Sequence, residues 1–229
     1  MCEAEVVRPA LFRVTVSAMI VALSNLPLTA QSEPTLRELA NQQGVSGAII
    51  DACGPPPSLS DIVEQSDLIV EGIVTARTSY LTPDDRDVFT DYDLTIQHVL
   101  LQRKVLASSR PGIAIPVIFK SHGGMVVIDG VKISVDINVN GARMTLGEGD
   151  HAYLLATLDA ADGKWLINAF HVFKIKGTDV ITAGPFRDLP REIPVPTFVQ
   201  RIGELQATAA IRPSSPRPSA RSAAPQRTS

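Results

Sequence analysis

The residues best suited to chemistry in this chain are a serine and a histidine followed by two glycines. Ser121 and His122 stand directly before Gly123 and Gly124, an arrangement similar to the glycine-rich loop that builds the oxyanion hole of some esterases. Such hydrolases also carry a Gly-x-Ser-x-Gly turn, which this sequence lacks. Since a glycine pair between apolar runs is typical of a turn or bulge, a hydrolase that uses Ser121 and His122 is only the alternative interpretation.

The densest polar cluster is a run of aspartates between two apolar segments. Carboxylate oxygens are the ligands that Ca²⁺ prefers, so a calcium site is one reading of this run. The spacing does not match an EF-hand loop, and a solvated loop accounts for the same residues. We therefore favour the loop and keep calcium as the alternative. The aspartates are Asp84, Asp85, Asp87, Asp91 and Asp93.

The histidines and aromatic residues provide two weaker candidates. No two histidines have the i, i+4 spacing of a helical zinc motif, and we expect His98 and His171 to be half-buried and hydrogen-bonded. The aromatic residues could line a ligand-binding face of a sheet, although core packing is the commoner use. We therefore assign no catalytic, cofactor-binding or metal-ligating residue. The histidines are His98, His122, His151 and His171, and the aromatic residues are Tyr92, Trp165, Phe170 and Phe173.

The elements that position these residues are predominantly strands. A short helix capped by Ser58 or Ser60 precedes the β-prone run 68–76, in which Gly72 predicts a bulge. Asp129-Gly130 and Asn140-Gly141 predict two-residue hairpin turns, because both turn positions require φ > 0. Further strands are expected at residues 89–101, 113–120, 125–128, 131–135, 152–158 and 165–175. This order predicts a mainly β fold, a small antiparallel barrel with flanking helices over residues 58–205.

The N-terminus resembles an export signal. An apolar stretch at 14–23 follows two arginines, and Ala30 ends a small-residue cleavage site. We expect residues 1–30 to be a signal peptide, with an uncleaved anchor as the alternative. The mature protein would be periplasmic or secreted and would have no stable membrane span. Cys53 is then its only cysteine, so no internal disulfide is expected.

The flanking segments differ from the predicted domain in composition. Residues 31–57 are expected to be a helical lead-in, capped by Ser32, followed by a Pro-rich linker. Residues 31–204 contain 22 acidic and 15 basic residues, a net charge of −7, which argues against nucleic-acid binding. Residues 197–205 could form a helix. Residues 206–229 are rich in Ala, Ser, Pro and Arg and are expected to be a disordered basic tail, suited to anionic envelope polymers.

One region resembles a known family. Residues 53–74 run from Cys53 through a short helix into an Asp-apolar-Val-x-Gly-x-Val strand, and residues 146–155 contain a Gly-x-x-Tyr-Leu-Leu-like strand. Both are similar to netrin-like domains, including the tissue inhibitors of metalloproteinases and related exported bacterial proteins of unknown function. The resemblance implies an OB-like five-stranded barrel. It also implies a protease-inhibitor alternative, for which Cys53 would have to be the mature N-terminus.

Together these patterns predict an exported protein that is not an enzyme. We expect a binding or structural module of the cell envelope, with an unidentified protein or an envelope polymer as its partner. No cofactor and no nucleic acid is expected. The hydrolase and the protease inhibitor are the alternatives, and the oligomeric state is open.

Overall fold

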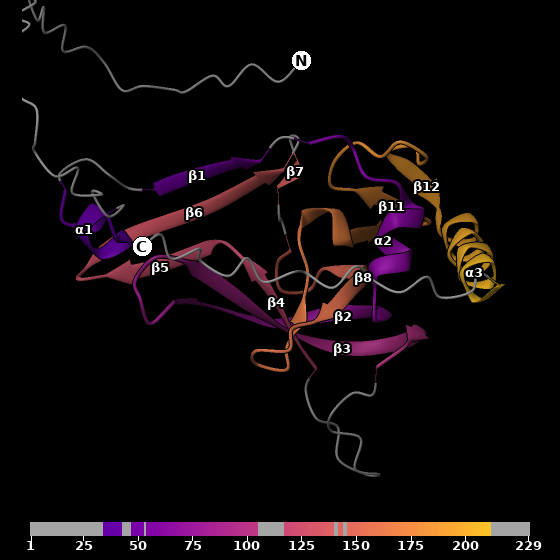
Figure 1. Cartoon of the computed structure of the whole chain (residues 1–229), viewed down its shortest axis with the longest axis horizontal. Helices are drawn as coiled ribbons and strands as arrows, with labels where there is room; N and C mark the ends of the chain where they lie inside the picture. Colours follow the sequence, from indigo (N-terminus) through magenta and orange to yellow (C-terminus); the bar gives the residue numbers. More distant parts are fainter. Residues whose placement is uncertain are drawn as a thin grey trace, which may run out of the picture.

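Alternating apolar residues in the centre of the chain build two β-sheets, and the predicted mainly β fold is confirmed (Figure 1). The computed structural model describes residues 34–42, 47–52, 54–104, 117–139, 142–143 and 146–211. Its helices are α1 (Leu36–Ala40), α2 (Leu59–Gln65), α3 (Val195–Ile211) and a 3-10 turn (Ala169–His171). Its strands are β1 (Gly47–Ala52), β2 (Leu68–Leu81), β3 (Val88–Gln102), β4 (Val117–His122), β5 (Gly124–Ile128), β6 (Val131–Val139), β7 (Ala142–Arg143), β8 (His151–Leu158), β9 (Trp165–Leu166), β10 (Val172–Lys176), β11 (Asp179–Thr182) and β12 (Glu192–Pro194).

The larger sheet has the strand order β12-β11-β10-β8-β2-β3-β4-β9. Strand β9 pairs with β4 in parallel and with β8 antiparallel. Because β8 also pairs with β2, the strands β2, β3, β4, β9 and β8 form a closed cycle of pairings. The three antiparallel strands β10, β11 and β12 extend this cycle from β8.

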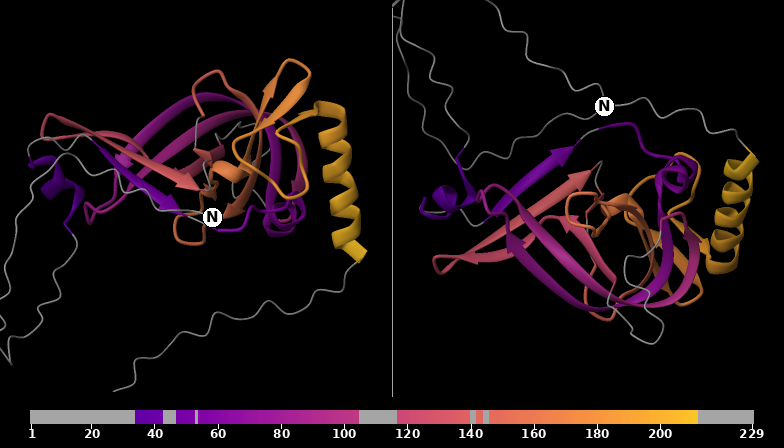
Figure 2. Two further views of the ribbon diagram at one scale, coloured as in Figure 1. Left: turned by 90° about the horizontal axis from the view of Figure 1, so that it is seen from above. Right: turned by 60° about the horizontal axis from the view of Figure 1, so that its bottom comes forward.

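The longest pairing joins β2 and β3, which curve strongly across the molecule (Figure 2). Three register shifts interrupt it, one of them between Glu71 and Gly72, which confirms the bulge predicted at this glycine. A Cβ on Gly72 would lie 2.9 Å from the carbonyl oxygen of Thr95. A larger residue would therefore push the two strands apart at the bulge.

The smaller sheet has the order β1-β6-β5, with β7 paired to β6. The Asp129-Gly130 hairpin between β5 and β6 is confirmed, with φ values of 50° and 85°. Strand β1 pairs in parallel with β6. Residues 31–57 were predicted to be a helical lead-in and linker, and this is wrong for 47–52, because their apolar run lies beside a central strand.

Helix α1 is shorter than expected, and its cap differs from the prediction. Thr35 caps the helix and forms a capping box with Glu38, whereas the predicted cap, Ser32, lies outside the described residues. Leu36 and Ala40 pack into a hydrophobic cluster with residues of β3, β5 and β6. The lead-in therefore belongs to the folded unit.

Two larger clusters fill the space around β8, which is buried on both faces. Leu154 lies in one cluster, with side chains of β2, β3, β4 and β9. Tyr153 and Leu155, on the opposite face, lie in the other cluster, with α2 and α3. Since side chains of a strand alternate between its two faces, this single strand supplies both cores.

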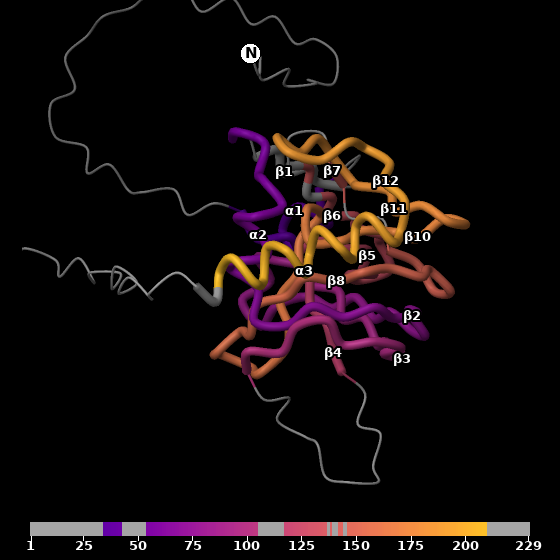
Figure 3. Tube along the Cα trace, turned by 90° about the vertical axis from the view of Figure 1, so that its right-hand side faces the viewer, coloured from indigo at the N-terminus to yellow at the C-terminus, as the bar shows by residue number. Residues whose placement is uncertain are grey.

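Helices α2 and α3 cover the larger sheet at the end of the molecule opposite α1 (Figure 1). Ser58 caps α2 with Asp61 at the third helical position, as predicted. Helix α3 contacts α2, β11 and β12 (Figure 3). It continues past Leu205 to Ile211, so the start of the disordered tail predicted at residue 206 is wrong. Ile202 and Phe198 bury the inner face of this helix.

The prediction of one continuous strand at 165–175 is wrong, because a 3-10 turn interrupts it. Asn168 caps the 3-10 turn there, and its side chain accepts a hydrogen bond from the backbone N–H of Phe170 at 2.9 Å. The turn separates β9 from β10 and directs them to different partners. The segments 1–33, 140–141 and 212–229 and Cys53 lie outside the described residues, and with them the signal peptide, the second hairpin turn and the rest of the tail.

No helix in the part of the chain that the structure describes is long and apolar enough to cross a membrane.

Replacing Phe198 with Ala should detach α3 from the larger sheet. The ring is fully buried and packs 5.3 Å from Tyr153 and 4.9 Å from Phe173, measured between ring centroids. Loss of such a buried ring costs about 3–5 kcal/mol. Urea denaturation should show this loss for Phe198→Ala, and a change within about 0.5 kcal/mol for the exposed neighbour Thr197→Ala. Equal stability of both variants would mean that α3 contributes nothing to the core.

Candidate functional site

The candidate site is a cavity of about 440 Å³ between the two sheets. One wall is formed by the adjacent ends of β2, β3 and β4, and the other by β5, β6 and β7. Leu146 and Gly147, which precede β8, close one side. We call it the first cavity.

A row of hydroxyl groups from three strands lines this cavity. Ser79, Thr90 and Ser121 are direct cross-strand partners, so their side chains share one face of the sheet. Thr90 Oγ1 donates to the carbonyl oxygen of Gly123 at 2.7 Å, and it lies 2.8 Å from Ser79 Oγ. Ser121 Oγ donates to the carbonyl oxygen of His122 at 3.2 Å. Thr90 and Ser121 are buried and donate to the protein, so the half-buried Ser79 is the hydroxyl of this row that is most open to a ligand.

The glycine pair joins β4 to β5 and lets β5 approach the hydroxyl row. Gly123 and Gly124 have φ values of 90° and 135°, which residues other than glycine rarely adopt. A Cβ on Gly124 would lie 2.2 Å from Thr90 Oγ1 and 2.5 Å from Ser79 Oγ. The glycines are therefore required by this close packing, which explains the motif without an oxyanion hole.

His122 lies on the opposite face of the sheet from Ser121. Tyr80, Phe89 and His122 are cross-strand partners on that face. The ring centroids of Phe89 and His122 are 4.1 Å apart, and those of Tyr80 and Phe89 are 6.3 Å apart. His122 is among the residues that line the first cavity, but its ring packs on Phe89 and consecutive residues of a strand point to opposite faces, so the Ser121–His122 pair of the hydrolase alternative is not assembled.

The next positions along the hydroxyl face carry an arginine and a tyrosine. Arg77 of β2 is the cross-strand partner of Tyr92 of β3, and both line the first cavity. Burial raises the pKa of Tyr92, although Ser121, Arg77 and Thr90 each oppose this shift. Tyr92 therefore stays a neutral phenol, and Arg77 provides a positive charge at the rim.

A second arginine faces the cavity from the smaller sheet. Arg143 lies on the short strand β7, opposite Asn138 of β6. Its neighbour Ala142 is fully buried, and a Cβ on Gly184 would lie 2.6 Å from the Ala142 Cβ. This tight contact fixes β7, and therefore fixes where the Arg143 backbone lies.

Most other cations of the described chain have carboxylate partners. The Nζ atom of Lys120 lies 2.6 Å from Asp159 and from Asp162, and 5.1 Å from the centre of the Phe89 ring. Lys164 pairs with Asp91 and lies over the Tyr80 ring. Within the described residues, the cations that have no ion pair are Arg77, Arg86, Arg103, Lys132, Arg143, Lys176 and Arg191, of which Arg103 donates to two backbone carbonyl oxygens.

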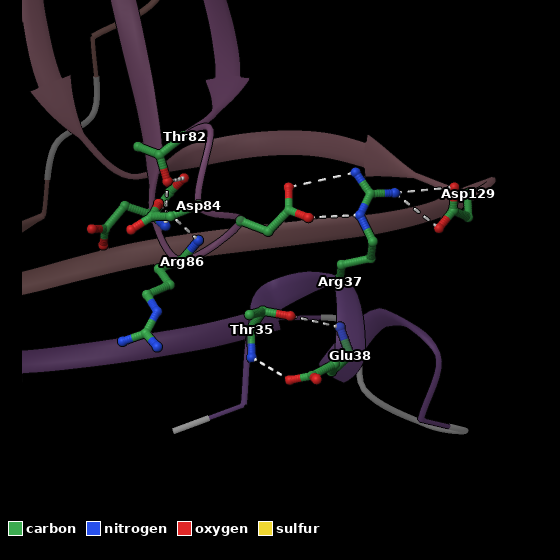
Figure 4. A network of polar contacts seen from close by, with 9 residues as sticks. Thr35, Arg37, Glu38, Thr82, Asp84, Arg86 and Asp129 are labelled. Atoms are coloured by element: carbon green, nitrogen blue, oxygen red, sulfur yellow. Dashed lines mark hydrogen bonds and ion pairs between the residues drawn. The ribbon is translucent and has the colours of Figure 1, made fainter. Parts of the chain in front are cut away.

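The predicted acidic loop is bound by an arginine of α1 (Figure 4). Arg37 Nε donates to Asp85 at 2.7 Å, and Arg37 Nη1 lies 3.1 Å from an oxygen of Asp129. Asp84 accepts from the backbone N–H of Arg86 at 3.4 Å, and hydrogen bonding from Thr82 lowers the pKa of Asp84. Asp87, Asp91 and Asp93 do not join them in a common ligand set, because the described residues contain no group of three metal-binding side chains.

The histidines do not converge. The prediction is wrong for His98, which is exposed, while His151 Nε2 lies 2.9 Å from Glu71. His171 keeps part of its surface accessible, and its Nδ1 accepts the backbone N–H of Asn168 at 3.3 Å. Burial lowers the pKa of His171 to about 4. It is therefore neutral at physiological pH.

The four aromatic residues considered for a ligand face are all buried. Tyr92 and Trp165 lie in one hydrophobic cluster, whereas Phe170 and Phe173 lie in the other. Only Tyr92 borders the first cavity. The alternative that these residues form one aromatic ligand-binding face is therefore wrong, because their rings fill two separate hydrophobic cores.

The sequence patterns missed both arginines of the cavity. Arg77 directly follows the predicted run 68–76, and its alternation with Ser79 contains a weak signal that both face one side. Arg143 follows a predicted turn and gives no such signal, because β7 is only two residues long. Its position depends on contacts between Ala142 and Gly184, which are far apart in the sequence.

No protein-family model matches the chain, and a search of curated proteins finds no match. The site is therefore interpreted from its own geometry.

The low pKa of His171 predicts a pH-dependent stability. The folded protein keeps this ring neutral to about pH 4, whereas in the unfolded chain it takes up a proton near pH 6.5. Stability should therefore fall as the pH decreases from about 6.5 to 4, by up to about 1.5 kcal/mol between pH 7 and 5. His171→Asn keeps a hydrogen-bond acceptor and should remove this part of the slope in urea titrations. An unchanged slope would show that His171 titrates normally.

The contact behind Arg143 can be tested by a pair of substitutions. Gly184→Ala should displace β7, because its new Cβ would overlap that of Ala142, and overpacking of this kind costs about 1–3 kcal/mol. Adding Ala142→Gly removes the opposing Cβ and should restore most of the stability. Thermal melts of both variants check this. A stable Gly184→Ala single variant would mean that β7 is not held by this contact.

Proposed function

We propose that this chain is a non-enzymatic binding module that takes an anionic ligand into the first cavity. Arg77 and Arg143 line it from the two sheets, and hydroxyl groups line the space between them. A guanidinium group has a planar set of donors that matches the oxygens of a carboxylate or a sulfate. The ligand class is therefore a small oxyanion or an oxyanion-bearing unit of a larger molecule.

The observation that carries the proposal is the distribution of unpaired cations. The folded region is acidic, with a net charge of −7 over residues 31–204, and half of the lysines and arginines in the described residues pair with carboxylates. Arg77 and Arg143 have no ion pair within the described residues and face the same cavity. The carboxylate that also lines it, Asp136, forms no ion pair with them in that part of the chain. A negative ligand would balance their charge.

We also propose that the cycle of β2, β3, β4, β9 and β8 is a small OB-like barrel of an exported protein. The pairing directions support this, because β4 and β9 are parallel while the other neighbours are antiparallel. Each of these strands contributes a side chain to one cluster: Leu68, Tyr92, Phe119, Trp165 and Leu154. OB-type barrels bind oligosaccharides and other polymers on the face of their second and third strands. Here those strands are β3 and β4, which border the first cavity.

The positions of Ser121 and His122 do not support hydrolysis. Ser121 and His122 point to opposite faces of β4, and Ser121 donates its proton to a backbone carbonyl. A serine nucleophile needs a base within hydrogen-bond reach. The cavity therefore supports binding better than it supports hydrolysis.

Substitution of the arginines tests this function. Galacturonate should shift the Nε–Hε signals of Arg77 and Arg143 in nitrogen-15 NMR titrations at low ionic strength. Arg77→Gln and Arg143→Gln should each weaken binding by about tenfold or more, since a charge-assisted hydrogen bond contributes about 1.5–3 kcal/mol. Sulfate, titrated separately, tests whether the site requires a carboxylate.

The control is Arg86→Gln, which removes the same charge from an exposed loop. It should bind galacturonate within about twofold of the unmodified protein, because a distant surface charge is screened by salt. Equal losses in all three variants would indicate non-specific attraction. The absence of any shift with either anion would rule out the proposed function.

A further inference from the structure

A second cavity, of about 310 Å³, meets the first at Arg143, which lines both. It lies along β10 and β11. Its other cationic lining residues are Lys174, Lys176 and Arg191. The remaining lining residues are small or apolar side chains of the same hairpin. Positive charge therefore continues from Arg77 across Arg143 into the second cavity.

The cations of the second cavity are largely available to a ligand. Lys174 lies 2.7 Å from Asp150, which leaves Lys176 and Arg191 without an ion pair in the described chain. Asp179 is the cross-strand partner of Lys176, but its carboxylate accepts a hydrogen bond from Thr178 at 3.2 Å. Arg191 is exposed, and its carbonyl oxygen accepts the backbone N–H of Thr182 at 3.0 Å. This bond holds the backbone of Arg191 at the cavity.

The unpaired cations are thus concentrated in one place. Of the six cations without an ion pair or a side-chain hydrogen bond in the described residues, four line the two cavities: Arg77, Arg143, Lys176 and Arg191. The other two, Arg86 and Lys132, do not line either cavity. In an acidic protein, such a continuous positive strip attracts an extended polyanion more strongly than a single small anion.

Carboxylates beside the strip narrow the ligand class. Asp136 lines the first cavity, and Asp150 lies beside Lys174 at the second. Burial opposes ionisation of Asp150, but hydrogen bonds from Lys174 and from the backbone N–H of Gly147 hold its pKa below the usual value. Asp150 is thus satisfied within the protein and lines neither cavity, whereas the Asp136 carboxylate faces the ligand and repels anions. A ligand that carries hydroxyl groups between its negative charges can donate a hydrogen bond to Asp136, whereas polyphosphate has no hydroxyl groups to donate.

We propose that the two cavities form one binding groove for an acidic polysaccharide, with Arg143 shared between adjacent acidic sugar units. Arg77 and the hydroxyl row bind one end of the bound segment, and Lys176 and Arg191 bind the other. Sugar hydroxyls donate to Asp136 and to the lone pairs of the serine and threonine side chains. This inference rests on the proposed function, because the first cavity is one of its two subsites.

Chain-length dependence of binding tests the groove. Calorimetric titration should show that a galacturonate hexamer binds at least about tenfold more tightly than the monomer, because the second contact forms at a high effective concentration. The double variant Lys176→Gln/Arg191→Gln should remove this gain, while galacturonate should still shift the Nε–Hε signal of Arg77, which lines the first cavity alone. The double variant Arg86→Gln/Lys132→Gln, with the same change of charge, should keep the gain.

Monomer and hexamer binding test the groove and the proposed function separately. If the monomer binds but the hexamer gains nothing, or if both double variants lose the gain equally, the groove is wrong and the first cavity remains an anion site. If neither sugar binds, the proposed function fails as well. Maltohexaose, which is neutral, should not bind. Polyphosphate of matched charge that binds as tightly as the hexamer would overturn the assignment to polysaccharides.

Discussion

The long antiparallel pairing of β2 with β3 is the constraint on which the rest of this structure depends. Its two strands supply side chains to all three hydrophobic clusters, with Ile69 in one, Val70 and Leu94 in the second, and Val88 in the third. One half of the hairpin pairs with β8 and is covered by helices, and the other half faces the smaller sheet. Because both halves share one backbone ladder, the core and the wall of the first cavity are fixed together.

Charge pairing leaves four of the six cations without an ion pair or a side-chain hydrogen bond in the described residues at the two cavities. Aspartates beside Lys120 and Lys164 neutralise these ammonium groups on the outer face of the hairpin, where aromatic rings also contact them. Arg37 is used in the same way to join α1 to two loops. The exposed pairs of Arg37 contribute little stability individually, whereas the Lys120 ammonium group is buried and is held by two aspartates.

The parts of the fold that were predictable depend on local signals. Period-2 alternation, the cap at Ser58 and the Asp129-Gly130 turn each act within a few residues, and the structure has all three. The strand β1 was missed because its parallel pairing needs a partner far along the chain, and β7 was missed because two residues are too few to show an alternation. The break at Asn168 was missed because a side-chain cap replaced a strand that the apolar residues favoured.

The candidate site was less predictable than the fold because its residues have little in common locally. Ser121 was singled out for a motif that serves close packing of glycines, while the residues that give the cavity its charge come from β2 and β7. Their proximity follows from two long-range contacts, Gly124 against Thr90 and Gly184 against Ala142, in which the absence of a side chain is the essential feature. A glycine in a sequence does not reveal which backbone or side chain it admits. Sites formed where two sheets meet are therefore determined by such contacts, and a single sequence specifies them only through the complete fold.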